Sequence, residues 1–354
     1  MEEVAAAQAP AVNASQRIEV EEQTQIGAAR RSAVALAHLH GLDSDAIGRL
    51  SLVVTEAATN LVRHAGRGVV ILRAIAAPGM SRAVEVLALD KGPGIGDVPR
   101  AMRDGFSSIG TAGQGLGAIQ RLADVFAMHA PRGQGTALMA RVNSGPRMAS
   151  AQRPRALEER LGVICTPIRG EVTSGDAWKL VATRNRQYLL LVDGLGHGPG
   201  AAAAAALAID AFVPHDDSPP DRSLVLLDQA TRGSRGAAAS LVCIDDTEHQ
   251  LRFCGVGNVD GRIHVGPDAT AHLLPQNGIV GHAMPTPRIT HAEWTPTSRL
   301  VMHSDGVSSR WRLDAYPGLA TAHPSLVAGI IYRDFGRERD DASVIVFDAP
   351  GVAA

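Results

Sequence analysis

The sequence predicts a protein of two α/β domains joined by a short linker. The chain has 354 residues, which is more than one ordinary hydrophobic core serves. A polar, basic stretch with proline and glycine runs from Asn143 to Arg155 without a periodic pattern, as interdomain linkers do. Helical patterns dominate before this stretch, and short strands with acidic ends follow it. We therefore expect a disordered tail over residues 1–16, a first domain over 17–142, a linker over 143–157 and a second domain over 158–350.

The composition is that of a globular protein without a strongly charged surface. Hydrophobic residues make up 45% of the chain and the formal net charge is −2, so nothing indicates a nucleic-acid or anionic-membrane partner. Cys165, Cys243 and Cys254 form no C-x-x-C pair, which favours a reducing compartment. The chain begins without a basic and apolar leader, and its longest apolar stretch, Ala201–Val213, is too short to span a bilayer. We expect a soluble, cytoplasmic protein.

The first domain is expected to combine two long helices with a sheet. One helix runs from Thr24 to His40 and ends at Gly41. The next runs from Asp43 to Ala65, with apolar residues at helical spacing and Asp43 or Ser44 as its cap. A short helix is expected over Ala118–Ala123. The predicted strands are Arg17–Val20, Val69–Ala74, Ala83–Leu89, Val125–His129 and Gly135–Val142.

The second long helix carries Glu56, Asn60 and His64 at positions i, i+4 and i+8, on one stripe. A carboxylate and a carboxamide one turn apart can supply a general base and an oxygen ligand for Mg²⁺. An isolated pair of this kind is also common on an ordinary solvated helix face. Its interpretation therefore depends on the motifs that follow.

Two glycine-rich segments follow the helix. Asp90 ends a predicted strand, and Gly92 and Gly94 follow it. The carboxylate can accept a hydrogen bond from an amine such as that of adenine. The glycines behind it allow the backbone to approach a ligand closely. A plain Gly/Pro loop is the alternative. Gly110–Gly117 then leads into a helix, where backbone N–H groups point at an anion. No Gly-Lys-Ser/Thr closes this loop and no strand precedes it, so it is neither a P-loop nor a dinucleotide fingerprint.

In order and spacing, these three segments resemble those of the GHKL ATP-binding domains over residues 17 to 143, and most of all those of the RsbT-type switch serine kinases. The resemblance implies a Bergerat-type α/β sandwich with helices on one face of a mixed sheet. It implies Glu56 as the base for a protein hydroxyl, Asn60 as a Mg²⁺ ligand and Asp90 as the adenine reader. The segment between Gly96 and Gly113 would be a short ATP lid. The glycines implied in ATP binding are Gly92, Gly94, Gly113, Gly115 and Gly117.

The second domain places acidic residues at the ends of predicted strands. Asp193-Gly194 ends one strand and is followed by His197, Asp305-Gly306 follows another, and Asp340-Asp341 precedes the last. Together with Asp176, these positions suit a binuclear site for hard metals, which prefer oxygen ligands. A single Asp-Gly is usually only a turn, and a lone histidine is more often structural. The strands are Leu161–Ile168, Trp178–Thr183, Gln187–Val192, Ala237–Ile244, Gln250–Gly255, Arg299–His303 and Ser343–Phe347.

This constellation resembles the PP2C-type phosphatases of the SpoIIE, RsbU and RsbX group over residues 160 to 350, which implies an α-β-β-α sandwich. Larger eukaryotic relatives bind phosphate with an arginine before the first acidic motif, where this chain has only Arg169. His197 is implied in proton transfer to the leaving serine oxygen. Mg²⁺ or Mn²⁺ would be bound by Asp176, Asp193, the Gly194 carbonyl, Asp305 and Asp340, with Asp341 as the alternative to Asp340.

The two resemblances together imply a bifunctional partner-switching protein. The first domain would use ATP to phosphorylate a serine or threonine of a STAS-domain antagonist or stressosome-type protein, in a pathway that controls a sigma factor. The second would remove phosphate from a phosphoprotein by two-metal hydrolysis. The alternative is a first domain that binds nucleotide and a partner without transferring phosphate and so regulates the phosphatase. The sequence leaves open whether the protein forms a homodimer.

Overall fold

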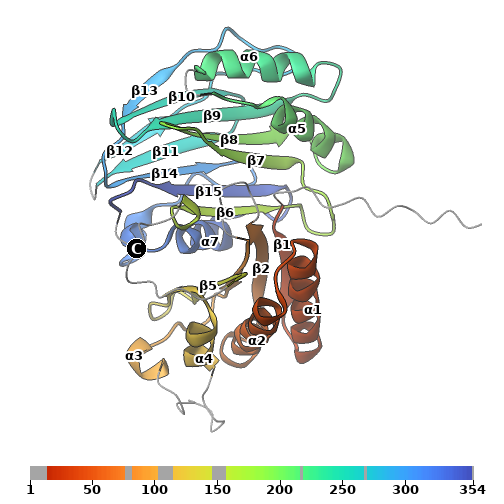
Figure 1. Cartoon of the computed structure of the whole chain (residues 1–354), viewed down its shortest axis with the longest axis vertical. Coiled ribbons are helices and arrows are strands. Elements are labelled where there is room, and N and C mark those ends of the chain that lie inside the picture. Colours follow the sequence, from red (N-terminus) through yellow and green to blue (C-terminus); the bar gives the residue numbers. More distant parts are fainter. Residues whose placement is uncertain are drawn as a thin grey trace, which may run out of the picture.

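The computed structural model describes residues 14–75, 82–102, 115–145, 157–215, 218–266 and 269–352. It has two α/β halves stacked along its long axis (Figure 1). The expected tail lies outside the described residues up to residue 13, and the expected linker does so over 146–156. None of the helices in the described ranges has the length and apolarity that crossing a bilayer needs.

The first half is a five-stranded sheet with helices packed on one face. Its sheet has the order β1-β2-β3-β5-β4. The helices α1, α2 and α4 pack on one face, around a core that includes Leu50, Val54 and Ile119, as we expected. The elements are β1 (Gln16–Val20), α1 (Gln23–Leu39), α2 (Ser44–Asn60), the π-helical turn η1 (Leu61–Ala65), β2 (Gly68–Ile75), β3 (Ala83–Leu89), α3 (Val98–Ala101), α4 (Gly115–Leu122), β4 (Val125–His129) and β5 (Ala137–Asn143).

The expectation of a mixed sheet in this half is wrong. Every neighbouring pair of strands in the described sheet is antiparallel. The chain reverses its direction three times between β1 and β2: on entering α1, on entering α2 and on entering β2. An odd number of reversals makes β2 antiparallel to β1.

The long predicted helix over residues 43–65 is an α-helix that widens at its end. The side chain of Asp43 caps it by accepting a 2.9 Å hydrogen bond from the amide of Ala46. Of the two predicted cap residues, Asp43 and Ser44, Asp43 is therefore the cap. The α-helix ends at Asn60, and the π-helical turn η1 continues to Gly66, which has a φ of 77°. Single π turns within helices are frequent at functional sites.

The second half is a sandwich of two five-stranded antiparallel sheets, as expected. The sheet orders are β13-β10-β9-β8-β7 and β12-β11-β14-β15-β6. Between them lies an apolar core in which Trp294 and Phe347 stack with their ring centroids 6.4 Å apart. The elements are β6 (Leu161–Thr166), β7 (Asp176–Ala182), β8 (Gln187–Gly194), α5 (Pro199–Ala211), α6 (Pro220–Thr231), β9 (Ala237–Asp245), β10 (Gln250–Val256), β11 (Asp260–Val265), β12 (Thr270–Leu273), β13 (Thr290–Glu293), β14 (Ser298–His303), α7 (Pro324–Phe335) and β15 (Ala342–Asp348).

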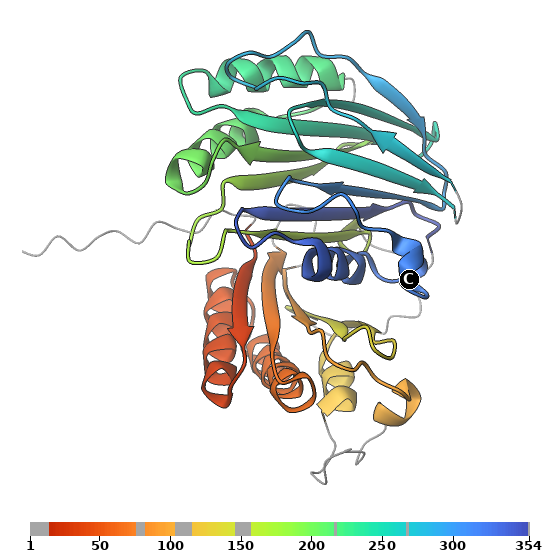
Figure 2. The same cartoon turned by 180° about the vertical axis from the view of Figure 1, so that it is seen from behind.

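Helix α7 lies between the two halves and is buried on both sides (Figure 2). One side packs on β6 and β15 of its own half, and the other packs on β3 and β5 of the first half. Leu326 and Ile330 of α7 share one apolar cluster with Ile71, Leu87 and Met139 of the first sheet. The first sheet is therefore covered on both faces, and a continuous core joins the halves.

A buried charge cluster lies within this contact. Glu85, on β3, pairs with Arg73 at 3.0 Å and Arg141 at 2.7 Å. Its Oε2 also accepts a 3.0 Å hydrogen bond from the hydroxyl of Ser325 on α7. Burial alone would raise the pKa of Glu85, but the two arginines outweigh it and lower the pKa to about 2. The carboxylate is therefore ionised and bonded from both halves.

Candidate functional site

Glu56 and Asn60 lie beside the start of helix α4. A Cβ atom added to Gly115 would lie 3.2 Å from Oδ1 of Asn60 and 3.4 Å from Oε2 of Glu56. The backbone of Gly115 thus approaches both side chains closely. The Nδ2 atom of Asn60 is buried and has no hydrogen-bond partner among the described residues, which is rare for a buried amide. A phosphate oxygen would satisfy this donor and leave Oδ1 for Mg²⁺.

Asp90 stands at the end of β3 with a side chain that backbone amides hold in place. Its Oδ1 accepts hydrogen bonds from the amides of Gly92 at 2.8 Å and Thr136 at 3.1 Å. No donor among the described residues bonds to Oδ2, so this oxygen can accept from an exocyclic amine. Gly94 has a φ of 69°, and a Cβ there would lie 2.1 Å from the Pro131 carbonyl oxygen, so only glycine fits.

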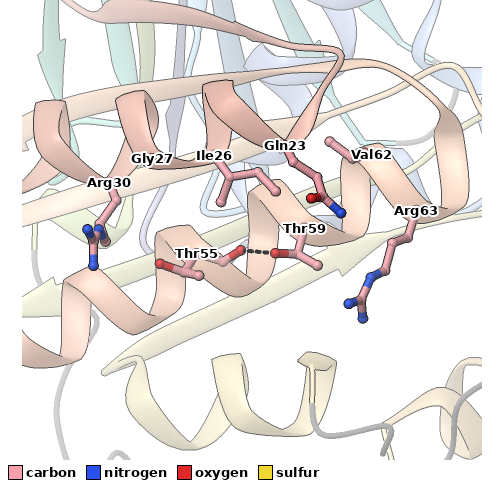
Figure 3. Close-up of a pocket in the computed structure, with 8 residues that line it drawn as sticks. All are labelled: Gln23, Ile26, Gly27, Arg30, Thr55, Thr59, Val62 and Arg63. Atoms are coloured by element: carbon pink, nitrogen blue, oxygen red, sulfur yellow. Dashed lines mark hydrogen bonds between the residues drawn. The ribbon is translucent and has the colours of Figure 1, made fainter. Parts of the chain in front are cut away.

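The remaining residues of the predicted ATP site are only partly described. Gly117 is buried in α4. Gly113 lies outside the described residues, as does most of the expected lid, over 103–114. A separate groove runs between α1 and α2 and is lined by Arg30, Thr55 and Arg63 (Figure 3). Neither Glu56 nor Asn60 lines that groove.

The second half gathers the predicted acidic ligands from four places in the chain. Asp176 opens β7 directly opposite Asp193 on β8, Asp305 follows β14, and Asp340 lies just before β15. Burial is the largest of the causes that raise the pKa of Asp193 to about 9, and the negative charges of Asp176, Asp305 and Asp340 come next. Burial likewise raises the pKa of Asp176 to about 7; a hydrogen bond from Ser304 opposes this shift, and Asp305 is among the carboxylates that add to it. The carboxylates are thus close enough to repel one another, and bound cations relieve such repulsion.

The donor set fits a hard divalent cation. Oδ2 of Asp176 accepts a 2.7 Å hydrogen bond from Ser304, whereas its Oδ1 is buried without a partner among the described residues. A cation would satisfy that oxygen. Across the part of the chain that the structure describes, no group of three or more His, Cys, Asp and Glu side chains is placed so that it could hold a metal ion. A cation here would take most of its ligands from water, as Mg²⁺ often does.

The neighbours Asp340 and Asp341 differ in what their carboxylates do. Asp341 accepts the amides of Ile168 and Gly175, one on each oxygen and each at 2.7 Å. Within the described ranges, the carboxylate of Asp340 accepts only the amide of Asp341, at 3.0 Å on Oδ1. Asp341 therefore fixes two loops, and Asp340 keeps oxygen lone pairs for a metal. Gly194, the other predicted ligand, is buried where a Cβ would lie 2.2 Å from the carbonyl oxygen of Ala201.

His197 lies in the loop after β8 and is exposed over 59% of its side chain. Its Nδ1 is 2.5 Å from Oε1 of Glu171, a residue to which the sequence assigned no role. Asn258, likewise unassigned, donates a 2.6 Å hydrogen bond to Oδ2 of Asp305. Glu171 and Asn258 belong to no spacing pattern with the acidic motifs, so only the fold brings them to the site.

One family match lies in each half of the structure, and the second leaves out β6 and β7. Residues 20–142 match the histidine kinase-like ATPase domain, and residues 183–350 match the family of stage II sporulation protein E, SpoIIE. The serine/threonine-protein kinase RsbT of Bacillus subtilis is 36% identical over 92 residues, which are 26% of this chain and 68% of RsbT. The phosphoserine phosphatase RsbX of the same organism is 27% identical over 140 residues, which are 39% of this chain and 70% of RsbX.

Solved structures are similar to about half of the chain. One, described as the bacterial stressosome, a modular system adapted to control secondary messenger signalling, is 28% identical with a TM-score of 0.49 and covers 53% of this chain and 97% of its own. RsbX in complex with magnesium is 22% identical with a TM-score of 0.47 and covers 52% of this chain and 92% of its own. From the family match and the identity with RsbT, the chain belongs to the RsbT family of histidine kinase-like ATPases through its first half, and its second half matches the SpoIIE family.

Proposed function

We propose that this protein both adds phosphate to and removes it from serine or threonine residues of partner proteins. The observation that carries the proposal is the carboxylate cluster in the second half, where Asp176 and Asp193 have pKa values raised by burial and by their acidic neighbours. Such a cluster is costly in a folded protein and is expected where cations bind. The match to the RsbT family supports the opposite reaction in the first half.

In the first half, Glu56 would accept the proton of the attacking hydroxyl, and Asp90 would orient the adenine. Asn60 would hold Mg²⁺ through Oδ1, and its orphaned Nδ2 would bond a phosphate oxygen. Phosphoryl transfer depends mainly on such positioning and on charge stabilisation. The closeness of Gly115 to Glu56 and Asn60 supports this assignment, since it brings the amide end of α4 to the same place.

In the second half, Asp176, Asp193, Asp305 and Asp340 would hold two divalent cations, with the carbonyl of Gly194 as a further ligand. When bound, Mg²⁺ or Mn²⁺ would lower the pKa of the attacking water and neutralise charge on the phosphoryl group. His197 would donate a proton to the leaving oxygen, and the contact of its Nδ1 with Glu171 supports this role. Asn258 would keep Asp305 oriented.

By analogy with the partner-switching relatives, we propose a cytoplasmic protein whose substrate is a STAS-domain antagonist or stressosome-type protein in a sigma-factor pathway. The kinase half is tested with purified protein, labelled ATP and a candidate STAS partner. Glu56→Ala should abolish labelling while ATP binding persists. Unchanged labelling would show that Glu56 is not the base. ATP binding by the wild type without labelling of any partner would favour the nucleotide-gated binding module.

The phosphatase half is tested with p-nitrophenyl phosphate and Mn²⁺ or Mg²⁺. Asp193→Asn and Asp305→Asn should each reduce turnover to background, because each removes a proposed metal ligand. Asp210→Asn is a matched control, because Asp210 lies on α5 away from the cluster. Full activity of either ligand variant would contradict the two-metal site.

A further inference from the structure

A cleft of about 360 Å³ lies where the two halves meet. The first half contributes Arg17 of β1 and Arg67, which follows η1. The second half contributes Arg169, Arg337 and Asp340. Because Asp340 is a proposed metal ligand, the cleft reaches the phosphatase site from the side of the ATPase half. Its walls therefore belong to both domains, and neither domain alone could form it.

Six basic and five acidic side chains line the cleft, and some of them are in ion pairs. Arg17 pairs with Glu19 at 2.5 Å, and Arg333 pairs with Asp334 at 2.7 Å. The remaining acids away from the metal and adenine sites are Glu21 and Glu338. Three exposed arginines have no hydrogen bond or ion pair from their side chains among the described residues, and these are Arg67, Arg169 and Arg337.

One donor of the cleft is buried and unsatisfied. The Nε atom of Arg17 is inaccessible to solvent and has no hydrogen-bond partner within the described part of the chain. Folded proteins rarely leave such a group unpaired. A bound segment would reach this donor only if the Arg17 side chain turned toward the cleft. As it stands, the cleft offers three exposed guanidinium groups to a negatively charged ligand.

We propose that this cleft binds the phosphoserine-bearing segment of the phosphatase's protein substrate, and that Arg67, from the ATPase half, selects segments with acidic residues beside the phosphoserine. The inference rests on the proposed phosphatase function. A phosphoserine bound at Asp340 would place its flanking residues along the cleft, where Arg67 and Arg17 face them. Arg67 is a specificity-determining residue in this proposal, since it lies outside the metal cluster.

The test uses the full-length chain and two synthetic phosphoserine peptides that differ only in flanking residues, acidic in one and alanine in the other. The wild type should have a KM about tenfold lower for the acidic peptide, because charge complementarity favours its binding. Arg67→Glu should remove this preference while kcat for the peptides and kcat/KM for p-nitrophenyl phosphate stay within about twofold of the wild type. Raising the salt concentration should weaken the preference in the wild type.

Arg63→Glu is the matched control, because Arg63 is an exposed arginine of η1 that faces the separate α1–α2 groove (Figure 3). It should keep the wild-type preference. An Arg67→Glu protein that keeps the preference, or an Arg63→Glu protein that loses it equally, would overturn the proposal. Fluorescence anisotropy of the labelled acidic peptide reports on the cleft without turnover. The wild type could hydrolyse nothing and still bind this peptide more tightly than Arg67→Glu does. In that case the phosphatase function fails and the cleft assignment stands. Equal binding by both proteins overturns the cleft assignment.

Discussion

The guanidinium of Arg333, in the last turn of α7, donates a 2.8 Å hydrogen bond from Nη1 to the backbone carbonyl of Asp90. The proposed adenine reader is therefore held from the phosphatase half. Two residues beyond the end of α7, the amide of Arg337 donates a 2.7 Å hydrogen bond to the carbonyl of Gly306, next to the proposed ligand Asp305. One helix end thus contacts the segments that carry both proposed sites.

Arg333→Met should weaken nucleotide binding and destabilise the protein. Methionine keeps much of the apolar stem but removes the donor to Asp90 and the ion pair with Asp334. Hydrogen bonds from charged groups contribute about 1.5–3 kcal/mol. We expect a loss of about 2 kcal/mol in the free energy of unfolding and a severalfold rise in the Kd for ADP. Urea denaturation and titration calorimetry measure the two effects. Arg310→Met, at an exposed position, is the control, and an unchanged Kd in Arg333→Met would show that Asp90 does not depend on this bond.

Asp340 and Asp341 should separate activity from stability. Asp340→Ala should abolish Mn²⁺-dependent hydrolysis with little change in thermal stability, because its carboxylate holds only one neighbouring amide. Asp341→Ala should destabilise the protein by several kcal/mol, since it leaves the half-buried amide of Ile168 and the buried amide of Gly175 without acceptors, at about 1–3 kcal/mol each. Differential scanning calorimetry and p-nitrophenyl phosphate assays on both variants decide the matter. The reverse pattern would assign Asp341 as the ligand.

The metal-free protein should become less stable as the pH rises. The pKa values of Asp176 and Asp193 are about 7 and about 9, against 3.8 for an ordinary aspartate. Above about pH 4 the folded protein therefore binds protons that the unfolded chain has lost, so its stability falls until about pH 9. Mg²⁺ should remove most of this decline by replacing those protons. Melting temperatures in EDTA and in Mg²⁺ across this range test the expectation.

Asp193→Asn is the check on that pH dependence. It deletes the group with the highest pKa in the cluster, so the decline in EDTA should be much shallower than in the wild type. A decline of wild-type steepness would place its origin outside the carboxylate cluster.

Glu85→Gln should destabilise the contact between the halves. The substitution leaves Arg73 and Arg141 buried without their carboxylate, and breaking a buried pair costs about 3–5 kcal/mol. Because the folded-state pKa of Glu85 is about 2 against an ordinary 4.5, its stabilisation is complete above about pH 4.5 and is lost as the pH falls toward 2. Acid unfolding of the wild type should therefore be steeper than that of Glu85→Gln. Glu248→Gln, at an exposed turn, should behave as the wild type.

Local patterns in the sequence predicted on which elements many residues of the two proposed sites lie. Glu56 and Asn60 share one helix, and Asp90 ends a buried strand, so spacing alone places them. The preference for Asp340 over Asp341 came from the family resemblance alone, since the amides of Ile168 and Gly175 that occupy Asp341 are distant in the sequence. The same holds for Glu171, whose role depends on where the loop of His197 lies.

The contact between the halves could not be predicted from the sequence either. The apolar residues of α7 indicate burial, but an apolar surface is non-directional and does not specify its partner. That Ile330 meets the first sheet as well as its own follows only from the assembled fold. The expected mixed sheet was wrong for a related reason, since the direction of β2 depends on how α1 and α2 return the chain.

The burial of α7 in both halves has a consequence for regulation. Two opposing enzymes made as separate proteins can be balanced by how much of each is made. Here the shared helix and the single chain fix their ratio at one to one in every molecule, and neither can diffuse away from the other. If both proposed activities operate, changing the amount of this protein alters both rates together, so the net direction must be set by ligands: ATP, divalent cations and the phosphorylation state of the partner.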